Sequence, residues 1–183
     1  MAPLAAREGR LDSLTPMARD TSDQSPGRDD LWLTDDQQRT WRAWLLGGAR
    51  INDHLDRVLR PHGLGLGDYE ILVSLSESPD REMRMSLLAD GVHQSRSRLT
   101  HAIARMEADG LVERRPASDD GRGVLAKLTD EGYALLARTA PTHVQSVRDI
   151  FIDVVDADDY AAIGRAMQAV LGAHPSERPT LRA

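Results

Sequence analysis

The feature that most constrains the fold of this chain is an abrupt change of pattern at Gly110. Over residues 94–108 the apolar side chains recur every three or four positions, which predicts an amphipathic helix. Its predicted core face covers about a third of the helical circle and consists of Leu99, Ala102, Ile103 and Met106. Gly110 suits the left-handed position that ends many helices, so we expect the helix to stop there.

The pattern after this helix is that of a hairpin. Two segments have the composition of short strands, 111–115 and 124–128, and the loop between them is rich in Ser, Asp and Gly. A shorter helix is predicted at 86–90, separated from the amphipathic helix by a tight turn. Helix, tight turn, helix and hairpin, in that order, predict a winged helix-turn-helix.

Longer helical patterns lie on both sides of this unit. They predict helices at about 34–60, 69–76, 130–155 and 157–171. Thr34 and Asp68 are the expected caps of the first two helices, and Pro141 should kink or split the third. The predicted fold class is therefore mainly α with a small β-hairpin wing.

The length of 183 residues suits one domain with tails. The N-terminal segment contains Pro, Gly and Ser without helical periodicity, so we expect it to be a disordered tail. The expected organisation is a tail at 1–33, one domain at 34–174 with a winged-helix lobe at about 64–129 and flanking helices at about 34–60 and 130–172, and a C-terminal tail at 175–183.

The distribution of charge matters more than its sum. The net charge is −6, but residues 81–127 carry nine Lys and Arg against seven Asp and Glu, so the rest of the chain carries −8. Residues 92–105 hold three arginines and no acidic residue. A local basic face can bind phosphates although the whole molecule is acidic.

The polar face of the amphipathic helix suits double-stranded DNA. In a helix-turn-helix the second helix enters the major groove, where Arg pairs with guanine, Gln with adenine, and Ser or His with bases or phosphate. The predicted DNA-binding residues are Gln94, Ser95, Arg96, Ser97, Arg98, His101 and Arg105, with Arg96 to the side, facing the backbone. The alternative is an ordinary solvated face, which the acid-free stretch and the following hairpin disfavour.

The hairpin loop supplies a second candidate contact. Arg122 lies near its tip, where the negative potential of a narrow minor groove favours a guanidinium. Asp120 could orient that arginine through a charge-assisted hydrogen bond. The alternative is a plain exposed turn, since Asp-Gly turns are common.

Three motifs of the hairpin bear a family resemblance. They are Leu111-Val112-Glu113-Arg114, then Asp120-Gly121-Arg122-Gly123-Val124, and then Leu128-Thr129 followed by Gly132. They resemble the wing of the MarR family of transcriptional regulators, and the resemblance covers about residues 35–172. Where the family often has two basic residues after the Asp, this chain has Gly121 and Arg122, which keeps the inserting arginine.

The resemblance implies a homodimer in which the terminal helices of two chains interlock, and a two-fold dimer implies a pseudo-palindromic operator. In many family members a small aromatic or anionic effector binds between these helices and the DNA-binding lobe. The sequence identifies neither a pocket nor an effector, and it leaves open whether the regulator is a repressor or an activator. The residues that independently favour a dimer are Trp41, Trp44, Phe151, Val154, Val155 and Met167, which exceed what a small lobe can cover. An intrachain helical layer is the alternative.

Several classes of function are disfavoured. The chain has no cysteine, and its histidines show no metal-ligand spacing, so we expect neither metal nor cofactor. No catalytic motif is present, and we expect no enzyme activity. No apolar run reaches the roughly 18 residues of a membrane span, and we expect a cytoplasmic protein. The alternative function is a winged helix for protein contact or dimerisation without specific DNA binding, which would not need the array of Arg98, Arg105 and Arg122.

Overall fold

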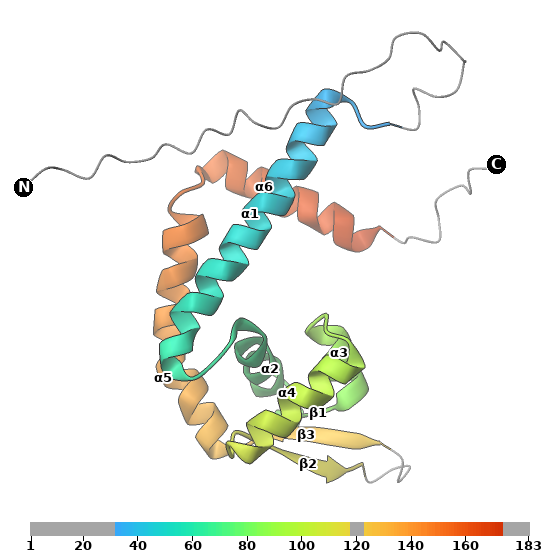
Figure 1. Ribbon diagram of the computed structural model, residues 1–183, viewed down its shortest axis with the longest axis vertical. Helices are drawn as coiled ribbons and strands as arrows, with labels where there is room; N and C mark the ends of the chain where they lie inside the picture. Colours follow the sequence, from blue (N-terminus) through green and yellow to red (C-terminus); the bar gives the residue numbers. More distant parts are fainter. Residues whose placement is uncertain (1–31, 118–122, 174–183) are drawn as a thin grey trace, which may run out of the picture. The chain divides into compact units, whose positions relative to one another are not determined.

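The computed structural model describes residues 32–117 and 123–173. Within them the chain is mainly helical with a small antiparallel sheet, which confirms the predicted fold class. The helices and strands are α1 (Asp35–Leu59), α2 (Leu66–Ser76), β1 (Glu82–Arg84), α3 (Met85–Gly91), α4 (Arg96–Ala108), β2 (Val112–Pro116), β3 (Val124–Leu128), α5 (Asp130–Val147) and α6 (Ala157–Gly172) (Figure 1). The chain falls into two units, up to Ala43 and from Trp44 onwards. Nearly all of the expected N-terminal tail and all of the C-terminal tail lie outside the described residues.

The sheet contains a strand that the sequence did not predict. Among the described residues its order is β1-β3-β2, with both pairs antiparallel. The expected hairpin forms between β2 and β3, with Val112 opposite Leu128. In addition, Met83 of β1 lies opposite Ala126 of β3. The return strand of the hairpin is therefore also joined to the segment that leads directly into α3.

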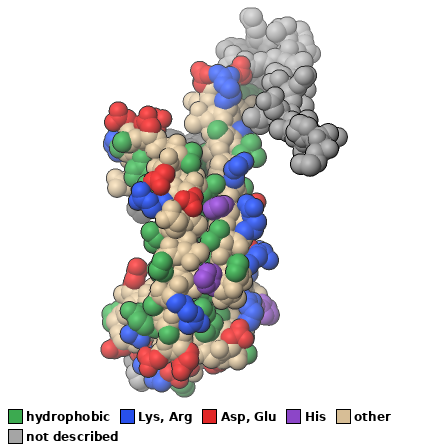
Figure 2. Space-filling model, turned by 90° about the vertical axis from the view of Figure 1, so that its left-hand side faces the viewer, with side chains coloured by type: hydrophobic (Ala, Val, Ile, Leu, Met, Phe, Trp, Pro, Cys, Tyr) green, Lys and Arg blue, Asp and Glu red, His purple; other side chains and the backbone are tan. Residues whose placement is uncertain are grey.

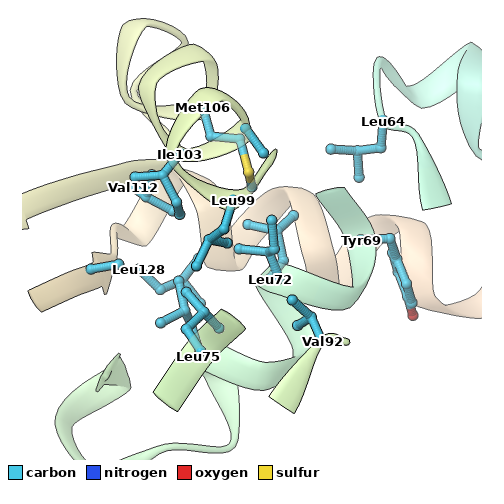
Figure 3. Packing of buried hydrophobic residues seen from close by; sticks show 14 of the residues in the cluster. Leu64, Tyr69, Leu72, Leu75, Val92, Leu99, Ile103, Met106, Val112 and Leu128 are labelled. Carbon is cyan, nitrogen blue, oxygen red and sulfur yellow. The ribbon is translucent and has the colours of Figure 1, made fainter. Parts of the chain in front are cut away.

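Side chains from α2, α4 and the sheet meet in one core (Figure 3). The buried side chains of this core include Leu72 and Leu75 from α2, Leu99, Ile103 and Met106 from α4, and Val112 and Leu128 from the strands. Burying each large apolar side chain contributes about 1.5–3 kcal/mol. The predicted core face of the amphipathic helix is thus confirmed, and the opposite face of α4 is left to solvent.

Two predicted helix starts are wrong by two or three residues. Helix α4 begins at Arg96, not at position 94, because Ser95 is the N-cap and its Oγ accepts the Arg98 N–H at 3.3 Å. Helix α2 begins at Leu66, so Asp68 lies within its first turn, as the N3 residue, and Gly65 is the N-cap. The Asp68 carboxylate instead accepts the N–H of Gly65 at 3.1 Å, an interaction that the positive end of a helix favours.

Pro141 does not split α5, which runs without a break from Asp130 to Val147. The proline removes one backbone hydrogen bond, but the helix continues through it, with Thr139 before it and Ser146 after it both buried. The irregularity comes later, as a π-helical turn at Arg148–Ile152. The helix predicted to reach residue 155 therefore ends earlier.

The junction between the sheet and α5 is tightly packed around Gly132. The Thr129 side chain caps α5 by accepting the Gly132 N–H at 3.0 Å, and it donates to the Gly110 carbonyl at 2.8 Å. A Cβ at Gly132 would lie 2.7 Å from Leu128 Cδ1 and 3.0 Å from the carbonyl carbon of Leu111. Only glycine fits this approach of α5 to the start of the hairpin.

The flanking helices keep large apolar side chains exposed. No residue of α6, all of which are described, is buried. Trp44 of α1 is 47% exposed and Val154 is 71% exposed, whereas Phe151, Val155 and Met167 are half-buried. Phe151 has an intrachain partner, since its ring lies 5.6 Å from that of Tyr160. In the N-terminal unit, Trp41 is also exposed. Figure 2 shows apolar side chains at the surface among the charged ones.

Candidate nucleic-acid interface

The exposed face of α4 is the strongest candidate site. At 100° per residue, Ser97 and His101 lie opposite the buried side, and Arg98 and Arg105 lie on one flank. The predicted residues that are exposed are Ser95, Arg96, Ser97, Arg98, His101 and Arg105. Three guanidinium groups and several uncharged donors therefore stand on one helix, without an acidic side chain before Glu107.

Gln94 differs from the other predicted contacts. It precedes α4 and is half-buried. A Cβ at Gly67 in α2 would lie 2.8 Å from Gln94 Nε2, so the amide packs directly on the backbone of α2. The structure places Gln94 between the helices rather than on the exposed face of α4.

Ion pairs hold both flanks of α4. On one flank Arg105 Nη2 lies 2.5 Å from Asp68 Oδ1, and the side chains are 58% and 15% exposed. On the other, Glu107 accepts the Arg114 N–H at 3.0 Å and the Arg114 Nε–H at 2.7 Å, which joins α4 to β2. The side-chain hydrogen bond from Arg114 lowers the pKa of Glu107. Sequence analysis missed both ion pairs, Asp68–Arg105 and Glu107–Arg114, because they depend on tertiary contacts.

The turn between α3 and α4 contains a residue in a left-handed conformation. His93 has a φ of 50°, which is uncommon for a residue other than glycine, although histidine tolerates it better than most. The neighbouring Val92 is buried in the core. Val92 therefore anchors the turn, while His93 reverses the chain so that α4 begins at Arg96.

The base of the wing is well defined. Strands β2 and β3 pair from Val112 opposite Leu128 to Pro116 opposite Val124, and the Ala117 N–H donates to the Gly123 carbonyl at 2.9 Å. Arg115 on β2 is exposed and forms an ion pair with Glu113. The predicted wing residues, Asp120 and Arg122, lie outside the described residues.

A groove of about 450 Å³ lies between the second half of α1 and α5. It is lined by His54, Val58, Pro141, Thr142, Gln145, Ser146 and Asp149. Within the described ranges, buried polar atoms without a hydrogen-bond partner are His54 Nε2, Thr139 Oγ1 and His143 Nδ1. The His143 ring lies 4.3 Å from that of Tyr69, and burial lowers the pKa of His143. Sequence analysis missed this groove, which joins residues about 90 positions apart.

The rest of the described chain offers little for other chemistry. In residues 32–117 and 123–173, no three His, Cys, Asp or Glu side chains gather as metal ligands would. None of the helices in these ranges is both long and apolar enough to cross a membrane.

Comparison with known proteins gives consistent results. A sequence model of the MarR family matches residues 62–123. The MarR-family regulator AbsC from Streptomyces coelicolor is 44% identical, with a TM-score of 0.73 over 76% of this chain and 95% of AbsC. Sco3205, a MarR-family regulator from the same organism solved in complex with DNA, is 43% identical, with a TM-score of 0.75 over 81% of this chain and 95% of Sco3205. The transcriptional regulator PecS from Dickeya dadantii (strain 3937) is 33% identical over 55% of this chain and 61% of PecS.

Proposed function

Because the chain belongs to the MarR family of transcriptional regulators, we propose that it binds a pseudo-palindromic operator in double-stranded DNA as a homodimer. The observation that carries this proposal is the exposed face of α4, which presents Arg96, Arg98 and His101 on a helix that has no acidic residue before Glu107. The complex of Sco3205 with DNA supports it, since that protein shares the fold and 43% of the aligned residues.

The residues of α4 divide by position. Arg98 lies in the first turn of the helix, where side chains reach base edges, and its guanidinium pairs with guanine in the major groove. Ser97 and His101 face the same groove. Arg96 lies towards the wing side of the helix and binds a backbone phosphate. At the tip of the wing, Arg122 enters the minor groove, a role supported by the sequence motif Asp120-x-Arg122.

The dimer is built from α1, α5 and α6. Its support is the exposure of large apolar side chains, such as Trp44 on α1 and Val154 in the turn before α6. Exposing apolar surface to water costs about 25 cal/mol per Å². Permanent homodimers bury more than about 2,000 Å². Sedimentation at low micromolar concentration should give about twice the chain mass of 20.2 kDa. A folded monomer at that concentration would contradict the dimer.

A small-molecule effector binds in the groove between α1 and α5. The support is chemical, because His54 Nε2 is buried there without a hydrogen-bond partner among the described residues. Val58 and Pro141 supply apolar walls beside the polar Gln145. A thermal-shift screen of small aromatic acids tests this proposal. A stabilising compound should lose its effect in His54→Leu and should weaken operator binding by the wild-type protein.

Selection of bound sites from random duplex DNA at controlled salt tests the proposed function as a whole. The expected result is one enriched motif with two-fold symmetry and half-site centres about one helical turn apart. If no motif is enriched and the protein binds random DNA no better than an acidic control protein, the winged helix serves protein contact instead.

A further inference from the structure

Two of the residues predicted to contact DNA lie against the first turn of α2. Gln94, just before α4, packs its amide on Gly67. Arg105, in the last turn of α4, donates to Asp68 Oδ1 at 2.5 Å. Gln94 and Arg105 are 11 residues apart, which is about three helical turns. Their side chains nevertheless contact adjacent residues of α2. The first turn of α2 therefore supports α4 at both of its ends.

Asp68 is built into this support. Its side chain is 15% exposed, and both of its oxygens have partners, because Oδ1 accepts from Arg105 and Oδ2 accepts the Gly65 N–H. Arg105 is the cation paired with this half-buried carboxylate. Withdrawing the guanidinium towards DNA would leave this carboxylate, which is mostly shielded from solvent, without its charged partner, and this opposes the withdrawal.

Arg105 is also far from the part of the helix that reads DNA. It lies seven residues after Arg98, which is about 10 Å along the helix axis. Base contacts in helix-turn-helix proteins come from the N-terminal residues of the recognition helix. Arg105 and Arg98 nevertheless lie at nearly the same angle around α4. A rotation of α4 that displaced Arg105 would therefore displace Arg98 in the same direction.

We propose that Arg105 is a positioning residue, which sets the orientation of α4 through Asp68 and does not itself bind DNA. This inference rests on the proposed function, since it concerns how the same helix meets its operator. On the opposite flank, the Glu107–Arg114 pair holds α4 to β2. With Arg105 anchored to α2, the helix is fixed on both sides, so that His101 is presented between these anchors and Arg98 is presented on the flank that Arg105 holds.

The test compares five variants for binding to the selected operator and to random duplex at several salt concentrations. Each phosphate contact contributes about 0.9 to the slope of log K against log salt. Arg96→Gln, which removes a proposed phosphate contact, should lower that slope by about one. Arg105→Gln should leave the slope and the affinity for random duplex unchanged. It should weaken operator binding about fivefold, the usual upper effect of one partly exposed ion pair.

Asp68→Asn gives the decisive result, because the two roles of Arg105 predict opposite signs. If Arg105 positions α4, Asp68→Asn weakens operator binding about as much as Arg105→Gln, and the double variant is no worse than either. If Arg105 binds DNA, Asp68→Asn frees it and strengthens binding. Asp109→Asn is the matched control. Asp109 directly follows α4 and is exposed, and its substitution changes the net charge by the same amount as Asp68→Asn.

Three results would separate the hypotheses. A lower salt slope for Arg105→Gln, or stronger operator binding by Asp68→Asn than by Asp109→Asn, would overturn the positioning role and leave the proposed function standing. Wild-type protein that binds no operator would overturn both. Thermal unfolding of each variant, with a melting temperature close to that of the wild type, excludes loss of the fold as the cause of weaker binding.

Discussion

Replacing Gly132 with alanine should destabilise the whole protein, although alanine is the better helix former. A Cβ at this position would lie 2.7 Å from Leu128 Cδ1 and 3.0 Å from the carbonyl carbon of Leu111. Leu128 is buried and can yield little, and the Leu111 carbonyl is backbone that also accepts the Thr129 N–H at 3.1 Å. Overpacking of this kind costs about 3 kcal/mol at the upper end of its usual range.

The gain in helix propensity from Gly to Ala offsets about 1 kcal/mol, which leaves a net loss of about 2 kcal/mol. For a chain of this size, that lowers the melting temperature by about 4–8 °C at a fixed protein concentration. Thermal unfolding followed by circular dichroism measures the change. Gly91→Ala, in α3, is the matched control, because its Cβ would meet only Ser74 Oγ, at 3.7 Å, and it should leave the stability unchanged or raise it by up to about 1 kcal/mol. A Gly132→Ala protein as stable as the control would show that α5 and the hairpin are not rigidly packed.

Three other predictions concern DNA binding and pH. Arg98→Ala should relax the preference at one base in each half-site, with a loss of about 1–3 kcal/mol of discrimination, measured with half-site variants. Arg122→Ala should lower affinity for most sequences and reduce the salt dependence; unchanged values would favour the protein-contact function of the hairpin. Burial lowers the pKa of His143 below 6.5, so the unfolded chain binds the proton more readily. The free energy of unfolding should therefore fall as the pH drops below about 6.5, and His143→Phe should remove this component in urea titrations at several pH values.

Local patterns were sufficient to predict much of the fold. The core face of α4 follows from residues three or four positions apart, and the hairpin follows from strand-like segments around a Gly-rich loop. Gly110 has a φ of 73°, as expected for a residue that ends a helix. In each case the interaction that decides the structure joins residues close together in the sequence.

Long-range pairing explains what could not be predicted. Strand β1 has only three residues and forms because Met83 meets Ala126 of a distant strand. Arg105 lies at a spacing along α4 that suits a DNA contact. Only the position of Asp68, 37 residues earlier, shows that the Arg105 side chain is held in an ion pair. Residue type and spacing identified the exposed face of α4 but could not distinguish side chains that face outwards from those held by a neighbouring helix.

The central position of β3 in the sheet has a consequence for the operator. This strand joins the hairpin to β1, which leads into α3, while β2 follows directly from α4. Under the proposed function, the helix in the major groove and the base of the wing beside it are therefore held at a fixed separation. The number of base pairs between their contacts should be the same in every half-site. The gap between two half-sites is set separately, by the dimer helices, which under the proposed function keep the half-site centres about one helical turn apart.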